Sequence, residues 1–198
     1  MKYPLVEVFD SIQGEGAFAG APCTFVRFAG CPLHCSFCDT DKQIHLRLSV
    51  ESVVELCHRH IVVLTGGEPT LHEIGPLARA LREDGHRVHL ETNGYIQVPY
   101  LSYDWVTLSP KKERLPVSWS VDEIKWLVPM WSLEEIIERA RQATTRVAVS
   151  YNYLQPINGK LTLNMLNVQR CIKMLEVADE RGFRLRLSLQ IHKIINAK

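Results

Sequence analysis

The stretch TFVRFAGCPLHCSFCDT, residues 24–40, contains the pattern that decides how this chain is built. Its first five residues have the composition of a β-strand, and a glycine then leads into a loop that carries three cysteines. Cys31, Cys35 and Cys38 follow the spacing C-x3-C-x2-C. The cysteine loop is therefore expected to follow the carboxyl end of a strand.

Strands and helices are expected to alternate on both sides of this loop. Ser49 is a suitable N-cap for one helix, and Ser132 with Glu135 forms the capping box of another. The expected strands are residues 5–9, 24–28, 61–64, 87–90, 105–108, 124–128, 147–149 and 183–189, and the expected helices are 49–58, 76–83, 132–143 and 163–181.

This alternation predicts an α/β fold with a mainly parallel sheet. The chain is shorter than the ~250 residues of a full eight-stranded barrel, so we expect an abbreviated, open TIM-like barrel with helices on one face only. Loops at the carboxyl ends of parallel strands gather at one mouth. The cysteine loop, TGGEPT, ETNG, LSPKK and YLQPING are all expected there.

Composition fits one globular domain over residues 1–198. The chain is 46% hydrophobic, and its 23 basic and 22 acidic residues give a net charge of +1. Near-neutral charge offers no global attraction to nucleic acid or to an anionic membrane. We find no secretory segment and no run of ~18 apolar residues, so we expect a cytoplasmic protein.

The cysteine loop has three interpretations. Three thiolates can hold a 4Fe-4S cluster with one open iron, because fully cysteine-ligated clusters have four. A zinc site completed by His34 or His45, or a set of buried thiols, is the alternative. Short loops with three cysteines are uncommon without metal, which favours the cluster.

A glycine-rich segment, GGEP at residues 66–69, is a second motif beside the three spaced cysteines. Together with Phe37 in the cysteine loop, it makes the chain resemble the radical S-adenosylmethionine superfamily. The resemblance implies that the amino and carboxylate groups of S-adenosylmethionine bind the open iron. Glu68 and the backbone of Gly66 and Gly67 would meet the amino group, and a carboxylate and carbonyls are suitable acceptors for an ammonium.

Dispersed segments narrow the resemblance to one family. They are SIQGEG at 11–16, Arg27, CDT at 38–40, ETNG at 91–94, SPK at 109–111 and LQIHK at 189–193. In this combination the chain resembles the 7-carboxy-7-deazaguanine synthases of queuosine biosynthesis. The resemblance implies radical ring contraction of 6-carboxy-5,6,7,8-tetrahydropterin to 7-carboxy-7-deazaguanine with loss of ammonia.

The resemblance also implies ligand contacts for the cofactors. Thr40 would contact Mg2+, for which a hydroxyl oxygen is a suitable ligand, although a capping threonine is the simpler alternative. The residues implied to bind S-adenosylmethionine are Phe37, Cys38, Asp39, Gly66, Gly67, Glu68, Gly94, Ser109, Pro110, Lys111 and Gln155.

The resemblance also implies a set of contacts for the pterin. Arg27 can grip a carboxylate with two hydrogen bonds, and Glu15 can accept from amino and ring N–H groups. An ordinary ion pair for Arg27 and a simple glycine turn around residue 14 are the alternatives. The residues implied to bind substrate are Ile12, Gln13, Gly14, Glu15, Arg27, Thr92, His192 on the last strand, and Lys198 at a tail that folds back.

Two other functions share parts of this pattern. A glycyl-radical enzyme activase would have the cysteine loop and GGEP, but it acts on a large protein and does not need the segment around Glu15. A non-catalytic electron-transfer module would need only the cysteines. The favoured family implies a homodimer and an electron donor such as flavodoxin or ferredoxin, with neither nucleic acid nor membrane as a partner.

Overall fold

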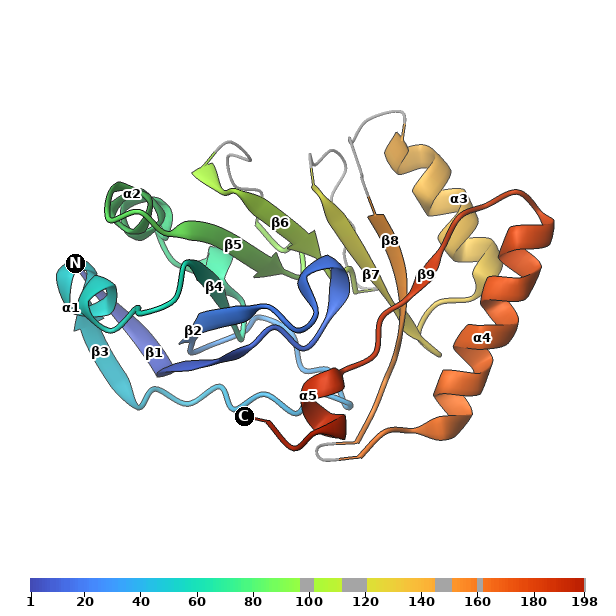
Figure 1. The fold of residues 1–198 in the computed structure, drawn as a ribbon, viewed down its shortest axis with the longest axis horizontal. Coiled ribbons are helices and arrows are strands. Elements are labelled where there is room, and N and C mark those ends of the chain that lie inside the picture. Colours follow the sequence, from blue (N-terminus) through green and yellow to red (C-terminus); the bar gives the residue numbers. More distant parts are fainter. Residues whose placement is uncertain (97–101, 112–120, 145–150, 160–161, 198) are drawn as a thin grey trace.

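The computed structural model describes residues 1–96, 102–111, 121–144, 151–159 and 162–197. Within these ranges the strands form one nine-stranded sheet in the order β3-β1-β2-β4-β5-β6-β7-β8-β9 (Figure 1). The strands are β1 (Lys2–Ile12), β2 (Pro22–Phe28), β3 (Leu46–Ser49), β4 (Ile61–Gly66), β5 (Arg87–Thr92), β6 (Trp105–Leu108), β7 (Glu123–Val128), β8 (Tyr151–Pro156) and β9 (Arg186–Leu187).

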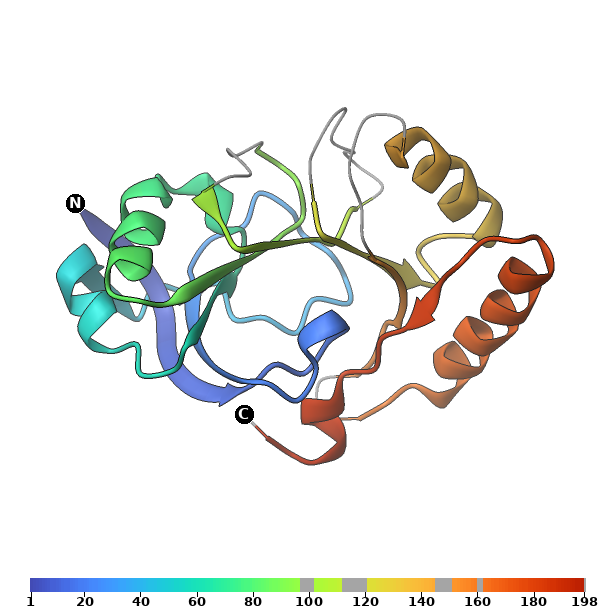
Figure 2. The same ribbon diagram turned by 45° about the horizontal axis from the view of Figure 1, so that its top comes forward.

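The sheet is parallel from β2 to β9, while β1 runs antiparallel to both β2 and β3. It curves around an interior that contains the cysteine loop and the short helix η1 (Gly16–Phe18), and its edges do not close (Figure 2). The prediction of an open, mainly parallel partial barrel is confirmed.

The four longer helices lie outside the curved sheet, as expected (Figure 2). Ser49 caps the first through its side chain, which accepts from the backbone N–H of Ser52. Ser132 and Glu135 form the predicted capping box. The helices are α1 (Val50–Glu55), α2 (Gly75–Glu83), α3 (Leu133–Thr144), α4 (Met165–Glu180) and the short α5 (Ile191–Ile194), with a further turn η2 (Pro69–Leu71).

Several boundaries differ from the sequence prediction. Residues 153–156, the first part of the expected strand-end loop YLQPING, belong to β8, because the backbone of β8 pairs with β7 along its whole length. The predicted strand at 183–189 shortens to β9, and β3 was not foreseen. His192 lies in α5 and not on a strand. The predicted strand at 147–149 lies outside the described residues.

Strand alternation separates an apolar outer face from a polar interior. Val88 and Leu90 of β5 belong to the main hydrophobic core under the helices. The alternate residues His89 and Glu91 line interior cavities. Because successive side chains point to opposite faces of a strand, one short segment supplies both the core and the interior.

The floor of the interior is aromatic. Phe18 of η1 stacks edge-on against His89 and Trp105, with ring centroids 4.5 and 4.9 Å apart, and Trp105 lies 5.9 Å from Tyr151. His89, Trp105 and Tyr151 belong to the first halves of β5, β6 and β8, and Phe18 belongs to η1. The aromatic floor therefore lies toward the amino ends of the strands, away from the strand-end loops.

Candidate active site

Two adjoining pockets open at the carboxyl ends of the strands. The cysteine pocket has a volume of about 200 Å³, and all five predicted strand-end segments contribute to its wall. The arginine pocket, named for Arg27, has a volume of about 530 Å³ and is lined by the end of β1, by β2 and by the C-terminal segment. Asp39, Thr40, Gly66 and Glu91 line both pockets. The expected convergence of these loops on one mouth is confirmed.

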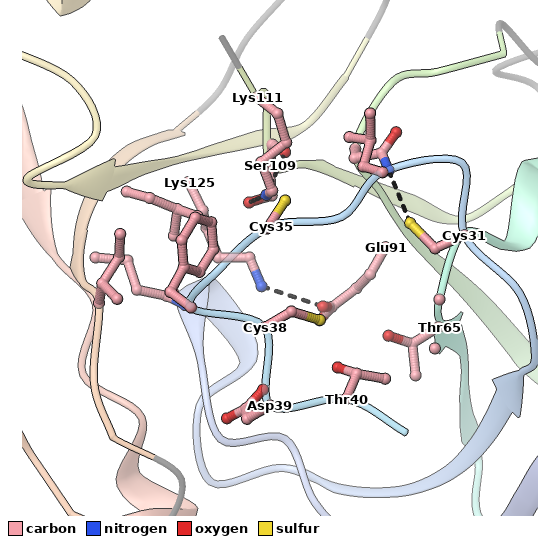
Figure 3. A pocket seen from close by; sticks show the side chains of 18 of the residues that line it. Cys31, Cys35, Cys38, Asp39, Thr40, Thr65, Glu91, Ser109, Lys111 and Lys125 are labelled. Atoms are coloured by element: carbon pink, nitrogen blue, oxygen red, sulfur yellow. Dashed lines mark hydrogen bonds and ion pairs between the residues drawn. The ribbon is translucent and has the colours of Figure 1, made fainter. Parts of the chain in front are cut away.

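The cysteine loop is folded by backbone contacts. The N–H of Cys38 donates to the carbonyl of Cys35 over 3.1 Å, and Lys42 Nζ donates to the carbonyl of Leu33 over 2.9 Å. All three cysteines are free thiols that line the pocket (Figure 3), and Asn93 Nδ2 lies 3.8 Å from Cys31 Sγ.

The three thiols of this loop are a donor set that suits a 4Fe-4S cluster. Among the described residues, no group of three His, Cys, Asp or Glu side chains converges on one metal ion. In a 4Fe-4S cluster each cysteine binds a different iron, so the thiolates stand around the cluster without meeting at one point. Neither His34 nor His45 lines the cysteine pocket, and His45 Nε2 lies 2.8 Å from Asp41.

Gly66 and Gly67 hold the end of β4 against the base of the cysteine loop. Gly66 has φ +125°, and a β-carbon there would stand 2.3 Å from the carbonyl oxygen of Phe28. A β-carbon on Gly67 would stand 1.8 Å from the carbonyl oxygen of Gly30. Only glycine permits this approach, which explains the residue type before any ligand is considered.

The carboxylate of Glu68 makes hydrogen bonds inside the protein. Its side chain is fully buried, and one carboxylate oxygen accepts from the hydroxyls of Thr70 and Thr92, each over 2.7 Å. The other oxygen accepts from the backbone N–H of Asn93 over 2.8 Å. Glu68 does not line either pocket. The described carboxylate joins the loops after β4 and β5, and its predicted contact with S-adenosylmethionine stays a prediction.

The far wall of the cysteine pocket includes Ser109 and Lys111. Lys111 Nζ donates to both the carbonyl and the hydroxyl oxygen of Ser109, each over 2.8 Å. Burial lowers the pKa of Lys111 to about 8. The carbonyl of Pro110 accepts from the indole of Trp131 over 3.3 Å, which anchors the segment.

The other predicted cofactor contacts divide into two groups. Phe37, Cys38, Asp39 and Gln155 line the cysteine pocket. Neither Pro110 nor Gly94 lines it, and their predicted contacts with S-adenosylmethionine stay predictions.

In the arginine pocket, Arg27 Nε lies 3.1 Å from Glu7 Oε1, and its guanidinium lies 5.6 Å from the centre of the Phe9 ring. The predicted substrate residues Ile12, Gln13, Gly14 and Glu15 also line this pocket. The ion pair that was the alternative for Arg27 is therefore present, at a position that still faces the cavity.

His192 reaches the same pocket from α5. A β-carbon on Gly14 would stand 1.8 Å from His192 Nδ1, and Ile191 N–H donates to the carbonyl of Gly14 over 2.9 Å. Burial lowers the pKa of His192. Residue 14 is therefore glycine because His192 occupies the space that a side chain would need. This reason adds to the glycine turn expected from the sequence.

Two of the three remaining predicted site residues lie among the described residues. Thr40 lines both pockets, and Thr92 lines the cysteine pocket with its hydroxyl bonded to Glu68. The magnesium contact of Thr40 stays a prediction. Lys198 lies outside the described residues.

Known proteins are similar to this chain, and several of them match nearly its whole length. The family model for the radical SAM superfamily matches residues 25–99. A 7-carboxy-7-deazaguanine synthase of Escherichia coli K12 is 31% identical over 234 residues, covering 99% of each chain. One from Bacteroides thetaiotaomicron is 34% identical, covering 97% of each. A Synechocystis relative of the same name is 42% identical over 59% of each chain.

The chain belongs to the 7-carboxy-7-deazaguanine synthase family. The crystal structure of QueE from Escherichia coli matches with a TM-score of 0.75 and 29% identity, covering 96% of this chain and 94% of that one. Streptococcus suis SuiB, at 15% identity and a TM-score of 0.52, shares the fold alone. As a radical SAM enzyme, a 7-carboxy-7-deazaguanine synthase uses a 4Fe-4S cluster and S-adenosylmethionine.

This 7-carboxy-7-deazaguanine synthase family member also carries interior charges that sequence reasoning missed. Lys125 Nζ lies 2.6 Å from Glu15 Oε2 and 3.2 Å from Glu91 Oε2, the latter contact drawn in Figure 3. Gln190 Nε2 donates to Glu15 Oε1 over 2.7 Å. The available signal was the segment DEIKWLV, in which acidic and basic residues interrupt a buried strand.

At the rim of the mouth, Lys193 Nζ lies 2.6 Å from Asp39 Oδ2 and donates to the carbonyl of Gly159 over 2.8 Å. This contact joins the C-terminal segment to the cysteine loop. No helix in the described part of the chain is long and apolar enough to cross a membrane.

Proposed function

We propose that this protein converts 6-carboxy-5,6,7,8-tetrahydropterin to 7-carboxy-7-deazaguanine with release of ammonia, in 7-deazapurine and queuosine biosynthesis. The observation that carries the proposal is the pair of adjoining pockets, one walled by the cysteine and glycine loops and the other by polar side chains around Arg27. Full-length similarity to relatives of that name supports the same reaction.

Cofactor binding would use the cysteine pocket. Cys31, Cys35 and Cys38 would hold the 4Fe-4S cluster. The bound cluster and S-adenosylmethionine together supply the radical that takes a hydrogen atom from the substrate. The glycine pair would let the cofactor approach the backbone, and Ser109, Lys111 and Gln155 offer polar groups for its ribose, carboxylate or adenine.

Substrate binding would use the arginine pocket. Arg27 has five N–H donors, of which the described contact with Glu7 uses the one on Nε, so the remaining fork can bind the pterin carboxylate. Gln13, the carboxylates of Glu15 and Glu91, and His192 surround the cavity with acceptors and donors for a polar bicycle. Because burial lowers the pKa of His192, its ring is neutral near pH 7 and can both donate and accept.

The magnesium ion, the second subunit and the electron donor belong to the same proposal. Thr40 lies between the two pockets, where its hydroxyl can join substrate oxygens and water around Mg2+. We propose a cytoplasmic, single-domain protein over residues 1–198 that works as a homodimer and receives electrons from a flavodoxin or ferredoxin.

Anaerobic turnover tests the proposal. Protein reconstituted with iron and sulfide, given a strong reductant and S-adenosylmethionine, is expected to form 7-carboxy-7-deazaguanine and one ammonia for each pterin consumed. Liquid chromatography with mass detection measures both products. Cleavage of S-adenosylmethionine without consumption of pterin would contradict the proposal, and glycyl-radical formation on a protein substrate would favour the activase instead.

A further inference from the structure

Lys125 occupies the centre of a buried charged group between the two pockets. The residue is 3% exposed and lies on β7, where Ile124 and Trp126 belong to the outer core. Strand alternation therefore turns Lys125 into the barrel, and it lines the cysteine pocket. Figure 3 shows its ammonium directed toward Glu91.

Two carboxylates from different elements share this ammonium. Glu15 follows the end of β1 and lines the arginine pocket, while Glu91 belongs to β5 and lines both pockets. Lys125 Nζ contacts one oxygen of each, at 2.6 and 3.2 Å. One side chain thus connects β7, β5 and the loop after β1.

The second oxygen of each carboxylate is held by an amide. Gln13 Nε2 donates to Glu91 Oε1 over 2.8 Å, and Gln190 Nε2 donates to Glu15 Oε1 over 2.7 Å. Both glutamines also line the arginine pocket. The orientation of four pocket side chains consequently depends on the position of a single ammonium.

The attraction between the charges of Lys125 and Glu15 makes the arrangement of these side chains strongly dependent on Lys125. Burial raises the pKa of Glu15, but the attraction of Lys125 outweighs it and lowers the pKa to about 2. A buried carboxylate that loses its cation is destabilised in its charged form, so it takes up a proton or turns toward water. Either response would change the face that the arginine pocket presents to a ligand.

We propose that Lys125 is a positioning residue that acts through Glu15 and Glu91 to set the acceptor face of the arginine pocket. The ligand class that this face fits is a flat heterocycle with several N–H donors, because carboxylate and amide oxygens accept hydrogen bonds in one cavity. The inference rests on the proposed function, which supplies such a substrate. It assigns Lys125 to substrate recognition and not to cofactor binding.

Kinetics of Lys125 variants test this assignment. In Lys125→Met holoenzyme, the KM for 6-carboxytetrahydropterin is expected to rise about tenfold or more, while the KM for S-adenosylmethionine changes by less than about twofold. Lys125→Arg keeps the charge and is expected to recover most of the pterin affinity. Arg181→Met is the matched control, because it removes an exposed cation that pairs with Glu134 far from the pockets.

A purely structural role would give a different pattern. It would lower the yield of folded holoenzyme but leave both KM values unchanged in the folded fraction. If Lys125→Met does not fold, Lys125→Gln retains an amide NH2 group, with two N–H donors, for the carboxylates and is measured in its place. An unchanged pterin KM, or equal losses for pterin and S-adenosylmethionine, would overturn the inference. Wild-type protein that forms no product would instead refute the proposed function.

Discussion

The mouth and the floor of the barrel interior are held together by different contacts. At the mouth, the cysteine loop and the glycine pair meet through backbone groups, with Gly67 N–H donating to the carbonyl of Phe28 over 2.9 Å. At the floor, Phe18, Trp105 and His89 pack ring against ring. The mouth therefore tolerates few changes of backbone shape, whereas the floor depends on side-chain volume and on keeping its histidine uncharged.

The mouth and the floor are therefore expected to control different properties of the protein. Backbone contacts at the mouth fix the positions of ligand-binding groups, so their loss should remove activity even where it also lowers stability. Apolar packing at the floor contributes to the free energy of unfolding, so its loss should first lower stability. Three substitutions test this division.

The largest effect is expected at the mouth from Cys35→Ala. The variant retains two thiols of the triplet and should lose the cluster, and with it all cleavage of S-adenosylmethionine. Iron content, visible absorbance and product formation measure the loss. Cys171→Ala is the control, because Cys171 is buried on α4 away from the pockets and should keep full iron content. Normal cluster content in Cys35→Ala would refute the assigned ligand set.

Gly67→Ala should have the next largest effect. Its β-carbon would meet the carbonyl oxygen of Gly30 at 1.8 Å, and backbone atoms cannot yield as a flexible side chain can. We expect a loss of about 4 kcal/mol in the free energy of unfolding together with loss of the cluster. Chemical denaturation and iron content measure these losses.

Gly75→Ala is the matched control for this change. Gly75 begins α2, and a β-carbon there would meet no atom within 4 Å. Its stability should stay the same or rise slightly, because alanine is the better helix former. Equal stability of the two variants would show that the close approach at Gly67 does not constrain the mouth.

The floor should respond to pH through His89. Burial lowers its pKa to about 4, from an ordinary value near 6.5. Between these values the unfolded chain binds a proton that the folded protein excludes, so the stability contribution is complete above pH 6.5 and decreases as pH falls toward 4. The full change is roughly 3 kcal/mol.

His89→Phe should remove this part of the pH dependence while it keeps the ring packing with Phe18 and Trp105. Thermal unfolding of both proteins between pH 4 and 7 measures the difference. Activity at neutral pH should change little, because His89 lines neither the cysteine pocket nor the arginine pocket. The same pH slope in both proteins would contradict a buried, neutral His89.

Local signals in the sequence were sufficient for much of the fold. Ser49 and the pair Ser132 and Glu135 act as the predicted caps, because capping depends on neighbours within one turn. Residues 153–156 were predicted as the start of a loop because they suit a loop as well as a strand, and only their pairing with β7 makes them part of β8. The same reason explains β3 and the shortened β9, whose extents depend on distant partners.

The candidate site, like the fold, was predicted from the sequence only in part. Cysteine spacing and the segment GGEP identified residues that do line one pocket, because short motifs record contacts made within a few residues. The motif did not indicate the internal partners of Glu68, whose carboxylate accepts hydrogen bonds from Thr70, Thr92 and Asn93. The direction of a side chain at a loop depends on which other loops surround it.

The alternation of strands and helices, the cysteine triplet and the family resemblance can be found without coordinates, because periodicity, capping and ligand spacing are all local. The position of Lys125 between Glu15 and Glu91, and the space that Gly14 leaves for His192, come from the folded structure. Those contacts join residues more than 30 positions apart, and their energies depend on burial, which the folded barrel alone creates.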